Sequence, residues 1–335
     1  MKTPFALFVI LSLSLYSCIG RVYVGKPGEF KNSKEKYSFV QEYESPENIH
    51  LTLSTVGGNV EVSGYEGNRV KVAFVVTNNN GDVLEMTLDE LQKYASFVIT
   101  KEGSNLSIEV KEIFKRNMSV GFVVKAPVKT VCSISTSGGN LDINNLVGDQ
   151  TLETSGGNIN MTKIKGQLSA QTSGGNIYLE DLTGKTEVST SGGNIDGKSI
   201  DGDLFAETSG GNIGLVDHKG ITEVSTSGGN IHLENLVGAV SAQTSGGNIH
   251  AKMIALSQKM FLETNGGFID CELPEGLGMN LELSGSDIKA NLNHFQGTTS
   301  PEHISGQING GGIPVQLNCP GGTLQLKFNK VTDNQ

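Results

Sequence analysis

Carboxylates on the polar side of a repeated pattern are the first candidates for chemistry in this sequence. Enzymes that cleave polysaccharides use clustered carboxylates, often with calcium or a basic group nearby. The candidate side chains are Glu180, Asp181, Asp217 and Glu234. The equivalent positions of other repeats hold Lys163, Lys198, Ser199 and Val216. These interruptions favour a solvated face over a polysaccharide-cleaving active site, so we predict no catalytic residue.

Two histidines, His232 and His250, stand one repeat apart and are expected on neighbouring coils of one outward column. Two imidazoles at that spacing can share a transition metal. Asp196 lies two repeats before His232, with Gly214 between them, so no third ligand is evident. We therefore predict exposed histidines and neither a metal nor a cofactor, although the sequence leaves open whether the pair binds metal.

The repeats that position these residues follow the phrase Thr-Ser-Gly-Gly-Asn-Ile. The first glycine of each pair recurs every 18 residues, at Gly138, Gly156, Gly174, Gly192, Gly210, Gly228 and Gly246. A second glycine series keeps the same period, at Gly148, Gly166, Gly184, Gly202, Gly220 and Gly238. A period this strict is typical of a repeat array with two turns in each unit.

Between the two turns, apolar and polar residues alternate. Leu152, Ala170 and Val188 occupy one apolar column, with polar residues on either side, and Ile177 and Leu179 begin a second run after the Gly-Gly turn. Period-two alternation indicates strands. Eighteen residues at about 3.3 Å each make a closed path of roughly 60 Å, which is one coil of a tube. The sequence predicts an all-β, single-stranded parallel β-helix, or β-solenoid, with right-handed coils.

The Gly-Gly turn is predicted to be an architectural corner. Glycine accepts positive φ, and asparagine tolerates left-handed geometry while its amide bonds to neighbouring backbone. In-register stacking would build an asparagine ladder from Asn140, Asn158, Asn176, Asn194, Asn212, Asn230 and Asn248. Phosphate cradling is the functional alternative, but seven copies without a following helix or lysine favour architecture.

Several residues fall in inward columns. Cys132 and Cys271 align with apolar residues, and we predict buried thiols because an odd number of cysteines after residue 18 argues against a disulfide framework. His218 aligns with Leu182 and Ile200, and a local distortion of the corner beside Asp217 is expected.

The N-terminus has the layout of a lipoprotein signal. Lys2 precedes an apolar run over residues 5–15 that is too short to span a membrane, and Leu-Tyr-Ser-Cys closes it at Cys18. This ending resembles the bacterial lipobox, which implies a lipid on Cys18 after cleavage. We predict a signal peptide and lipobox over residues 1–18 and a flexible tether over residues 19–36.

Two further features of the sequence help to set the domain boundaries. Gly57 precedes Gly138 by 81 residues, which is not a multiple of 18, so an insertion must interrupt the array. Thr87 and Glu90 form a capping box before helical spacing, which predicts a short helix near residues 87–95. We expect N-terminal coils over residues 37–130, the regular array over residues 131–270, and irregular coils with a cap over residues 271–335.

The 335 residues carry a formal charge of −10, which disfavours nucleic acid as a partner.

The lipobox, the Ser-Gly-Gly-Asn-Ile corners and a closing Asn309-Gly310-Gly311-Gly312-Ile313 segment together resemble a bacterial putative-adhesin family of unknown function. The resemblance implies a non-catalytic, lipid-anchored β-solenoid of the cell envelope, in the outer membrane, that serves as an adhesin-like interaction or structural surface with a glycan or protein ligand. A polysaccharide-active enzyme and an envelope-stress or regulatory lipoprotein are the alternatives. Outward aromatic residues reduce to Tyr178, Phe205 and Phe261 and form no stripe.

Overall fold

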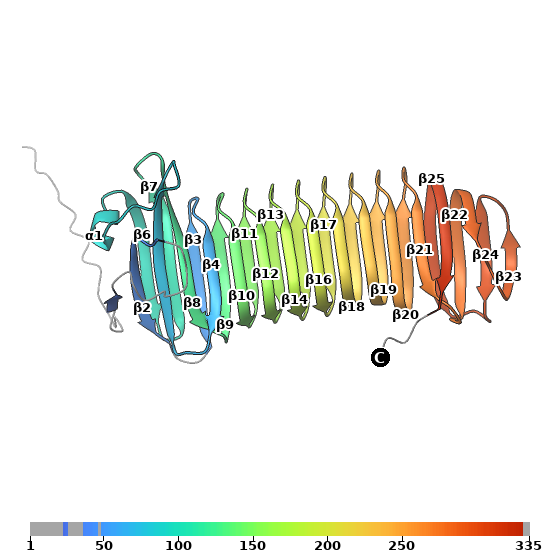
Figure 1. Cartoon of the computed structure of the whole chain (residues 1–335), viewed down its shortest axis with the longest axis horizontal. Helices are drawn as coiled ribbons and strands as arrows, with labels where there is room; N and C mark the ends of the chain where they lie inside the picture. Colours follow the sequence, from blue (N-terminus) through green and yellow to red (C-terminus); the bar gives the residue numbers. More distant parts are fainter. Residues whose placement is uncertain (1–22, 26–35, 46–47, 331–335) are drawn as a thin grey trace, which may run out of the picture.

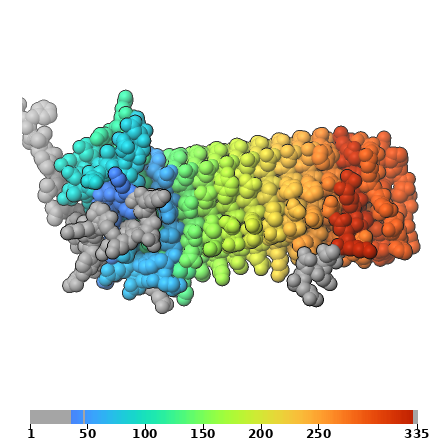
Figure 2. Space-filling view, in the orientation of Figure 1, coloured from blue at the N-terminus to red at the C-terminus, as the bar shows by residue number. Residues whose placement is uncertain are grey.

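The computed structural model describes residues 23–25, 36–45 and 48–330 of the chain. These residues form a straight rod of stacked β coils with a broader N-terminal end (Figure 1). Figure 2 shows the regular part of the rod as a body of even width. Within the described residues, no helix is long and apolar enough to cross a membrane. The predicted all-β solenoid with one short helix is confirmed.

Each coil of the regular array contributes to two parallel ladders, one entering the Gly-Gly corner and one leaving it. Residues 18 apart are paired in both ladders, as in Ala170 with Val188 and Ile177 with Ile195. The array strands are β9 (Thr130–Thr136), β10 (Leu141–Val147), β11 (Gln150–Thr154), β12 (Ile159–Lys165), β13 (Leu168–Thr172), β14 (Ile177–Thr183), β15 (Thr186–Thr190), β16 (Ile195–Asp201), β17 (Leu204–Thr208), β18 (Ile213–Thr226), β19 (Ile231–Thr244) and β20 (Ile249–Thr264).

Alternating side chains of these strands fill the tube. In the coil that contains β12 and β13, the buried residues are Ile159, Met161, Ile164, Leu168, Ala170 and Thr172. A continuous apolar core runs through the coils of the array. Because each coil covers the apolar face of the next, the stacking itself stabilises the fold.

Two of the three bends in each coil use left-handed backbone. In the strands that follow the Gly-Gly corner from β10 to β19, the fifth residue has positive φ, with values from 55° to 59° at Asn145, Lys163, Asp181, Ser199, Asp217 and Asn235. The second glycine series also has positive φ, from 126° to 147°. Only glycine adopts the latter region without strain, which explains why glycine recurs in this column from Gly148 to Gly238.

The Gly-Gly corner differs from the prediction, because none of its array glycines has positive φ. The second glycine is required for close approach instead. A Cβ on Gly175 would lie 1.9 Å from the carbonyl oxygen of Gly157 in the coil below, whereas Gly174 has no atom nearer than 3.9 Å. The short distance to the backbone of the coil below, rather than the geometry of the turn, therefore requires glycine at the second position.

At the N-terminal end, coils are stacked out of chain order. Strand β3 (Ile49–Thr55) lies between β7 (Asn105–Ile113) and β9, and β4 (Val60–Tyr65) lies between β8 (Met118–Pro127) and β10. The 81-residue offset thus places Gly58 directly against Gly139, although 63 residues of β5 to β8 intervene between Tyr65 and Lys129. The corner column continues unbroken across the insertion.

The prediction of solenoid coils throughout residues 37–130 was wrong in part. Strands β2 (Phe39–Glu44), β5 (Arg69–Asn78) and β6 (Ala95–Glu102) pair antiparallel, in the order β2, β5, β8 and in a β6–β7 hairpin. The predicted helix α1 (Leu88–Leu91) is present with its Thr87–Glu90 capping box, and Leu91 is fully buried. Antiparallel strands and the helix thus cover the N-terminal end of the rod in place of a further coil.

Of the predicted tether over residues 19–36, only residues 23–25 and 36 are among the described residues. Strand β1 (Tyr23–Gly25) pairs antiparallel with β2 and joins the edge of the terminal sheet. The predicted signal, its lipobox and Cys18 lie outside the described residues. The chain is thus attached to the folded end of the rod only five residues after Cys18.

At the C-terminal end, strands are also stacked in an order that differs from their order in the chain. Strand β25 (Ile313–Asn329) lies between the coil of β20 and β21 (Ile269–Pro274) and the coil of β22 (Met279–Ala290). Strands β24 (His303–Ile308) and β23 (Phe295–Thr299) then close the tip as an antiparallel hairpin (Figure 1). The irregular C-terminal coils thus end in a hairpin, and the last described strand is internal to the rod.

Candidate interaction surface

The asparagine corner is a ladder of side chain to main chain bonds. The backbone N–H of Asn194 donates to Oδ1 of Asn176 at 2.8 Å, and the same bond recurs along the array at 2.8–2.9 Å. The ladder begins at Asn59 and ends where Phe268 donates to Asn248 at 3.0 Å. The predicted residues stack as expected, but each amide oxygen bonds to the next coil's backbone rather than to the next amide.

A second ladder of buried threonines was not predicted. The Thr172 hydroxyl donates to the Gly157 carbonyl at 2.9 Å and accepts the N–H of Gly175 at 3.3 Å. The same pair of bonds recurs at Thr136, Thr154, Thr190, Thr208, Thr226, Thr244 and Thr264. The signal was present in the sequence, since a hydroxyl that never varies in an inward column needs a buried partner.

These bonds leave no phosphate cradle at the corner. In the coil around Gly174, the N–H groups of residues 173–177 donate to Ser155 O, Ser155 O, Thr172 Oγ1, Asn158 Oδ1 and Asn194 O respectively. A phosphate site requires several convergent N–H groups without partners. The repeated glycines of this chain therefore serve coil stacking.

The outward carboxylates do not converge either. Asp181 and Asp217 occupy the left-handed position of their coils, two coils or about 10 Å apart at the usual strand spacing. Asp and Asn tolerate this conformation well, which accounts for acidic residues in the column. Asp217 accepts a bond from the Asn235 amide at 3.0 Å.

Glu234 belongs to a charged strip near the C-terminal end. Its carboxylate is 3.4 Å from Lys252 Nζ and 3.4 Å from His232 Nε2, and the hydrogen bond from Lys252 lowers the pKa of Glu234. On the next coils, Lys327 lies 3.0 Å from Asp270 and 3.9 Å from Glu272. Charges of alternating sign on adjacent coils neutralise one another, as on a solvated surface.

The two candidate histidines are stacked. The rings of His232 and His250 have centroids 4.8 Å apart and planes inclined by 13°. Asp270 follows them in the same column, and its Oδ2 lies 3.3 Å from His250 Nδ1. The sequence reading missed Asp270 because the step from Ile249 to Ile269 is 20 residues rather than 18. Among the described residues, no group of three or more His, Cys, Asp or Glu side chains has a geometry suited to a metal ion.

His218 is buried without the predicted distortion. Asp217 and Gly220 keep the φ values of their equivalents, and His218 pairs in register with Ile200. Its Nε2 donates to the Gly202 carbonyl and its Nδ1 accepts the Thr222 hydroxyl, both at 2.8 Å, as the neutral tautomer. Burial lowers the pKa of His218. The coil accommodates the ring because both nitrogens are satisfied.

The cysteines beyond residue 18 are buried thiols, as predicted for Cys132 and Cys271. Burial raises the pKa of Cys132 to about 12, so the thiolate is disfavoured. Cys319 takes the place of threonine in the hydroxyl ladder, and its Sγ–H donates to Gly267 O at 3.0 Å. Within the described chain these thiols are free, and each serves packing.

One groove near these ladders lies where the array meets the terminal sheet. This groove has a volume of about 460 Å³ and is lined by Asn59, Asn140, Asp142, Thr77 and Ser119, among others. The exposed aromatics of the array are Tyr178 and Phe205, which lie on different ladders, and Phe268, which lies at the end of the asparagine corner. They form no stripe. The sides of the rod are therefore polar, and the nonpolar exposure is scattered along them.

The family model of the Toastrack domain DUF4097 matches residues 29–327. The chain belongs to this family. A comparison with curated proteins gave no match. Among solved structures, the Toastrack chain resembles a "putative adhesin" from Parabacteroides distasonis at 13% identity, covering 92% of this chain and 97% of that one with a TM-score of 0.42. It also resembles a "putative adhesin" from Bacteroides fragilis at 16% identity, covering 69% and 95% with a TM-score of 0.39.

Proposed function

We propose that this Toastrack protein is a non-catalytic, lipid-anchored component of the bacterial cell envelope whose rigid rod acts as an adhesin-like interaction or structural surface. One observation carries the proposal. The corner ladders run without interruption from Asn59 to Phe268, and their polar groups bond to neighbouring coils. A rod held together in this way presents long solvated faces rather than an enclosed reaction site.

Attachment through a lipid on Cys18 in the outer membrane completes the proposal. We expect Cys18→Ala to abolish acyl labelling and to move the protein from the membrane fraction to the soluble fraction of the producing cells. Retention of the label in this variant would contradict lipidation at Cys18. The rod itself should keep its thermal unfolding profile, because the described fold begins at Tyr23.

Protease shaving of intact cells tests the interaction surface. Loss of the rod from intact cells, with a lysed sample as control, is the result expected of a surface that meets glycans or proteins outside the cell. Protection until lysis would place the rod in the periplasm and would overturn the adhesin-like role in favour of a structural or regulatory one. Cleavage of acidic polysaccharides that is lost in Asp181→Ala or Asp217→Ala would contradict the non-catalytic assignment.

A further inference from the structure

The N-terminal end of the rod exposes a pair of aromatic side chains. Phe114 is 57% exposed, the highest value among the exposed large hydrophobic residues, and Tyr94 is 36% exposed. The backbone N–H of Phe114 donates to the Tyr94 carbonyl at 2.7 Å, which holds the two residues side by side where β6 begins and β7 ends. Neither side chain belongs to the core, so their exposure needs another explanation.

Three cations are close to this pair in the sequence. Lys93 precedes Tyr94, Lys115 and Arg116 follow Phe114, and all three are exposed. Lys115 Nζ lies 4.8 Å from the centroid of the Tyr94 ring. Across the described part of the chain, no ion pair joins these three cations to a carboxylate. We call Lys93, Tyr94, Phe114, Lys115 and Arg116 the cap patch.

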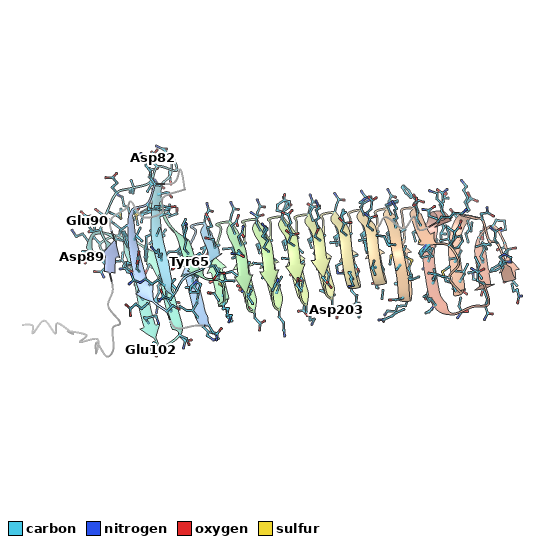
Figure 3. The ribbon with its side chains drawn as sticks, turned by 60° about the horizontal axis from the view of Figure 1, so that its bottom comes forward. Tyr65, Asp82, Asp89, Glu90, Glu102 and Asp203 are labelled. Atoms are coloured by element: carbon cyan, nitrogen blue, oxygen red, sulfur yellow. The ribbon has the colours of Figure 1, made fainter. Side chains whose placement is uncertain are left out.

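Acidic residues lie at the same end, among them Asp82, Asp89, Glu90 and Glu102 (Figure 3). Asp89 and Glu90 stand in the first turn of α1, and Glu90 Oε2 accepts the backbone N–H of Thr87 at 2.8 Å. Glu90 is therefore engaged in capping the helix. The cap patch is a local cluster of cations and rings rather than part of a uniformly basic surface.

The position of the cap patch relative to the N-terminus suggests its partner. Strand β1 and helix α1 both lie at this tip of the rod (Figure 1). Cys18 precedes Tyr23 by five residues, a span of at most about 17 Å. A lipid on Cys18 would hold this end, rather than the sides or the far tip, next to the bilayer.

We propose that the cap patch binds the phospholipid bilayer surface, with Tyr94 and Phe114 in the interfacial layer and Lys93, Lys115 and Arg116 at headgroup phosphates. Aromatic rings and long cationic side chains suit this boundary, because one part of each is apolar and the other is wet. The patch supplies a second membrane contact beside the lipid and sets the rod upright. Its orientation rests on the proposed anchor at Cys18, whereas its affinity for phospholipid does not.

Sedimentation with vesicles tests the patch without the anchor. The protein is produced from residue 19 onward, which retains every described strand, and is mixed with phosphatidylglycerol–phosphatidylcholine vesicles. We expect binding, and an about tenfold or greater loss of the partition coefficient in the Tyr94→Ser, Phe114→Ser double variant. Lys115→Gln with Arg116→Gln should weaken binding most on vesicles rich in phosphatidylglycerol.

Phe205→Ser is the matched control, because Phe205 is 42% exposed in the middle of the array, and its binding should equal that of the parent. Absence of vesicle binding by the parent would overturn the proposal, as would equal losses in the control and in the double variant. Unchanged thermal unfolding establishes that each variant is folded. Acyl labelling at Cys18 is measured separately, so failure of the patch and failure of the anchor are distinguishable.

Discussion

The array and the two ends of the rod are built from the same contacts but in different chain order. In residues 131–270, each coil after the first stacks on the coil that precedes it in sequence. At the ends, β3 with β4 and the single strand β25 are inserted between coils that lie elsewhere in the chain. The corner is nevertheless preserved, since a Cβ would lie 2.0 Å from the coil below at both Gly139 and Gly322.

This comparison shows that the position of a coil in the stack depends on the surface that it packs against and not on its place in the sequence. The end coils face antiparallel hairpins on their outer side, which cover apolar edges that a free coil would expose. Strand β25 is hydrogen-bonded on both sides although it is the last described strand.

Substitution of the second glycine of a corner should lower the free energy of unfolding more than any other change considered for the array and the ends. Gly193→Ala places a Cβ 1.9 Å from the Gly175 carbonyl oxygen and should lower the free energy of unfolding by about 3 kcal/mol or more. Gly322→Ala should cost a similar amount if the end coil obeys the same stacking. Gly192→Ala is the control, with no atom nearer than 3.8 Å, and should change stability by at most about 0.5 kcal/mol. Equal losses at Gly192 and Gly193, measured by urea unfolding, would contradict the stacking argument.

Replacing either of two equivalent threonines of the array by valine should have different effects on stability. Thr222→Val removes the donor to His218 Nδ1 and should destabilise the protein by about 1–3 kcal/mol. Thr186 stands in the same column, but its buried hydroxyl has no hydrogen-bond partner among the described residues. Thr186→Val should therefore be neutral or raise stability by about 1 kcal/mol. Calorimetric melting of both variants checks the difference, and destabilisation by Thr186→Val would show an unrecognised partner.

The asparagine ladder should contribute a smaller, uniform amount in each coil. Asn194→Ala removes the acceptor for the Asn212 N–H and should lower the free energy of unfolding by about 1 kcal/mol. Asn160→Ala serves as the control, because its described side-chain bond is a 3.4 Å contact with Asp142 on the exposed face. If Asn194→Ala melts at the parental temperature, the ladder does not contribute to stability.

Acidification should produce the smallest effect, through His218. Its pKa is lowered in the folded state by burial, so the folded protein favours the neutral ring more than the unfolded chain does. This contribution is complete above an unfolded pKa of about 6.5 and is lost as pH falls through the lower folded value. Urea unfolding at pH 7.5 and pH 5 should show a smaller loss in His218→Leu than in the parent, while exposed His232→Leu should match the parent. Identical losses in all three proteins would contradict the assignment.

The candidate site could be anticipated where a residue's role follows from its column. Asn140 to Asn248 and Cys132 were placed by counting in steps of 18, and Cys271 by its distance from the preceding Gly-Gly pair. Asp270 was missed because two extra residues shift the last coil, and the threonine ladder was missed because its column was read only as strand alternation. The cap patch has no periodic signal, since Tyr94 and Phe114 are brought together by the β6–β7 hairpin.

The sequence by itself determined the coil length, the alternation of buried and exposed residues, and the position of the corners. These properties are local, because period-two strands and a repeated turn need no knowledge of distant residues. Only the tertiary structure decided the order of the end coils, the pairing of β1 with β2, and the reason for the second glycine. Each of these depends on which surfaces meet. Paired residues that stand 81 or 55 apart in the sequence carry no local pattern that predicts which coil they will stack on.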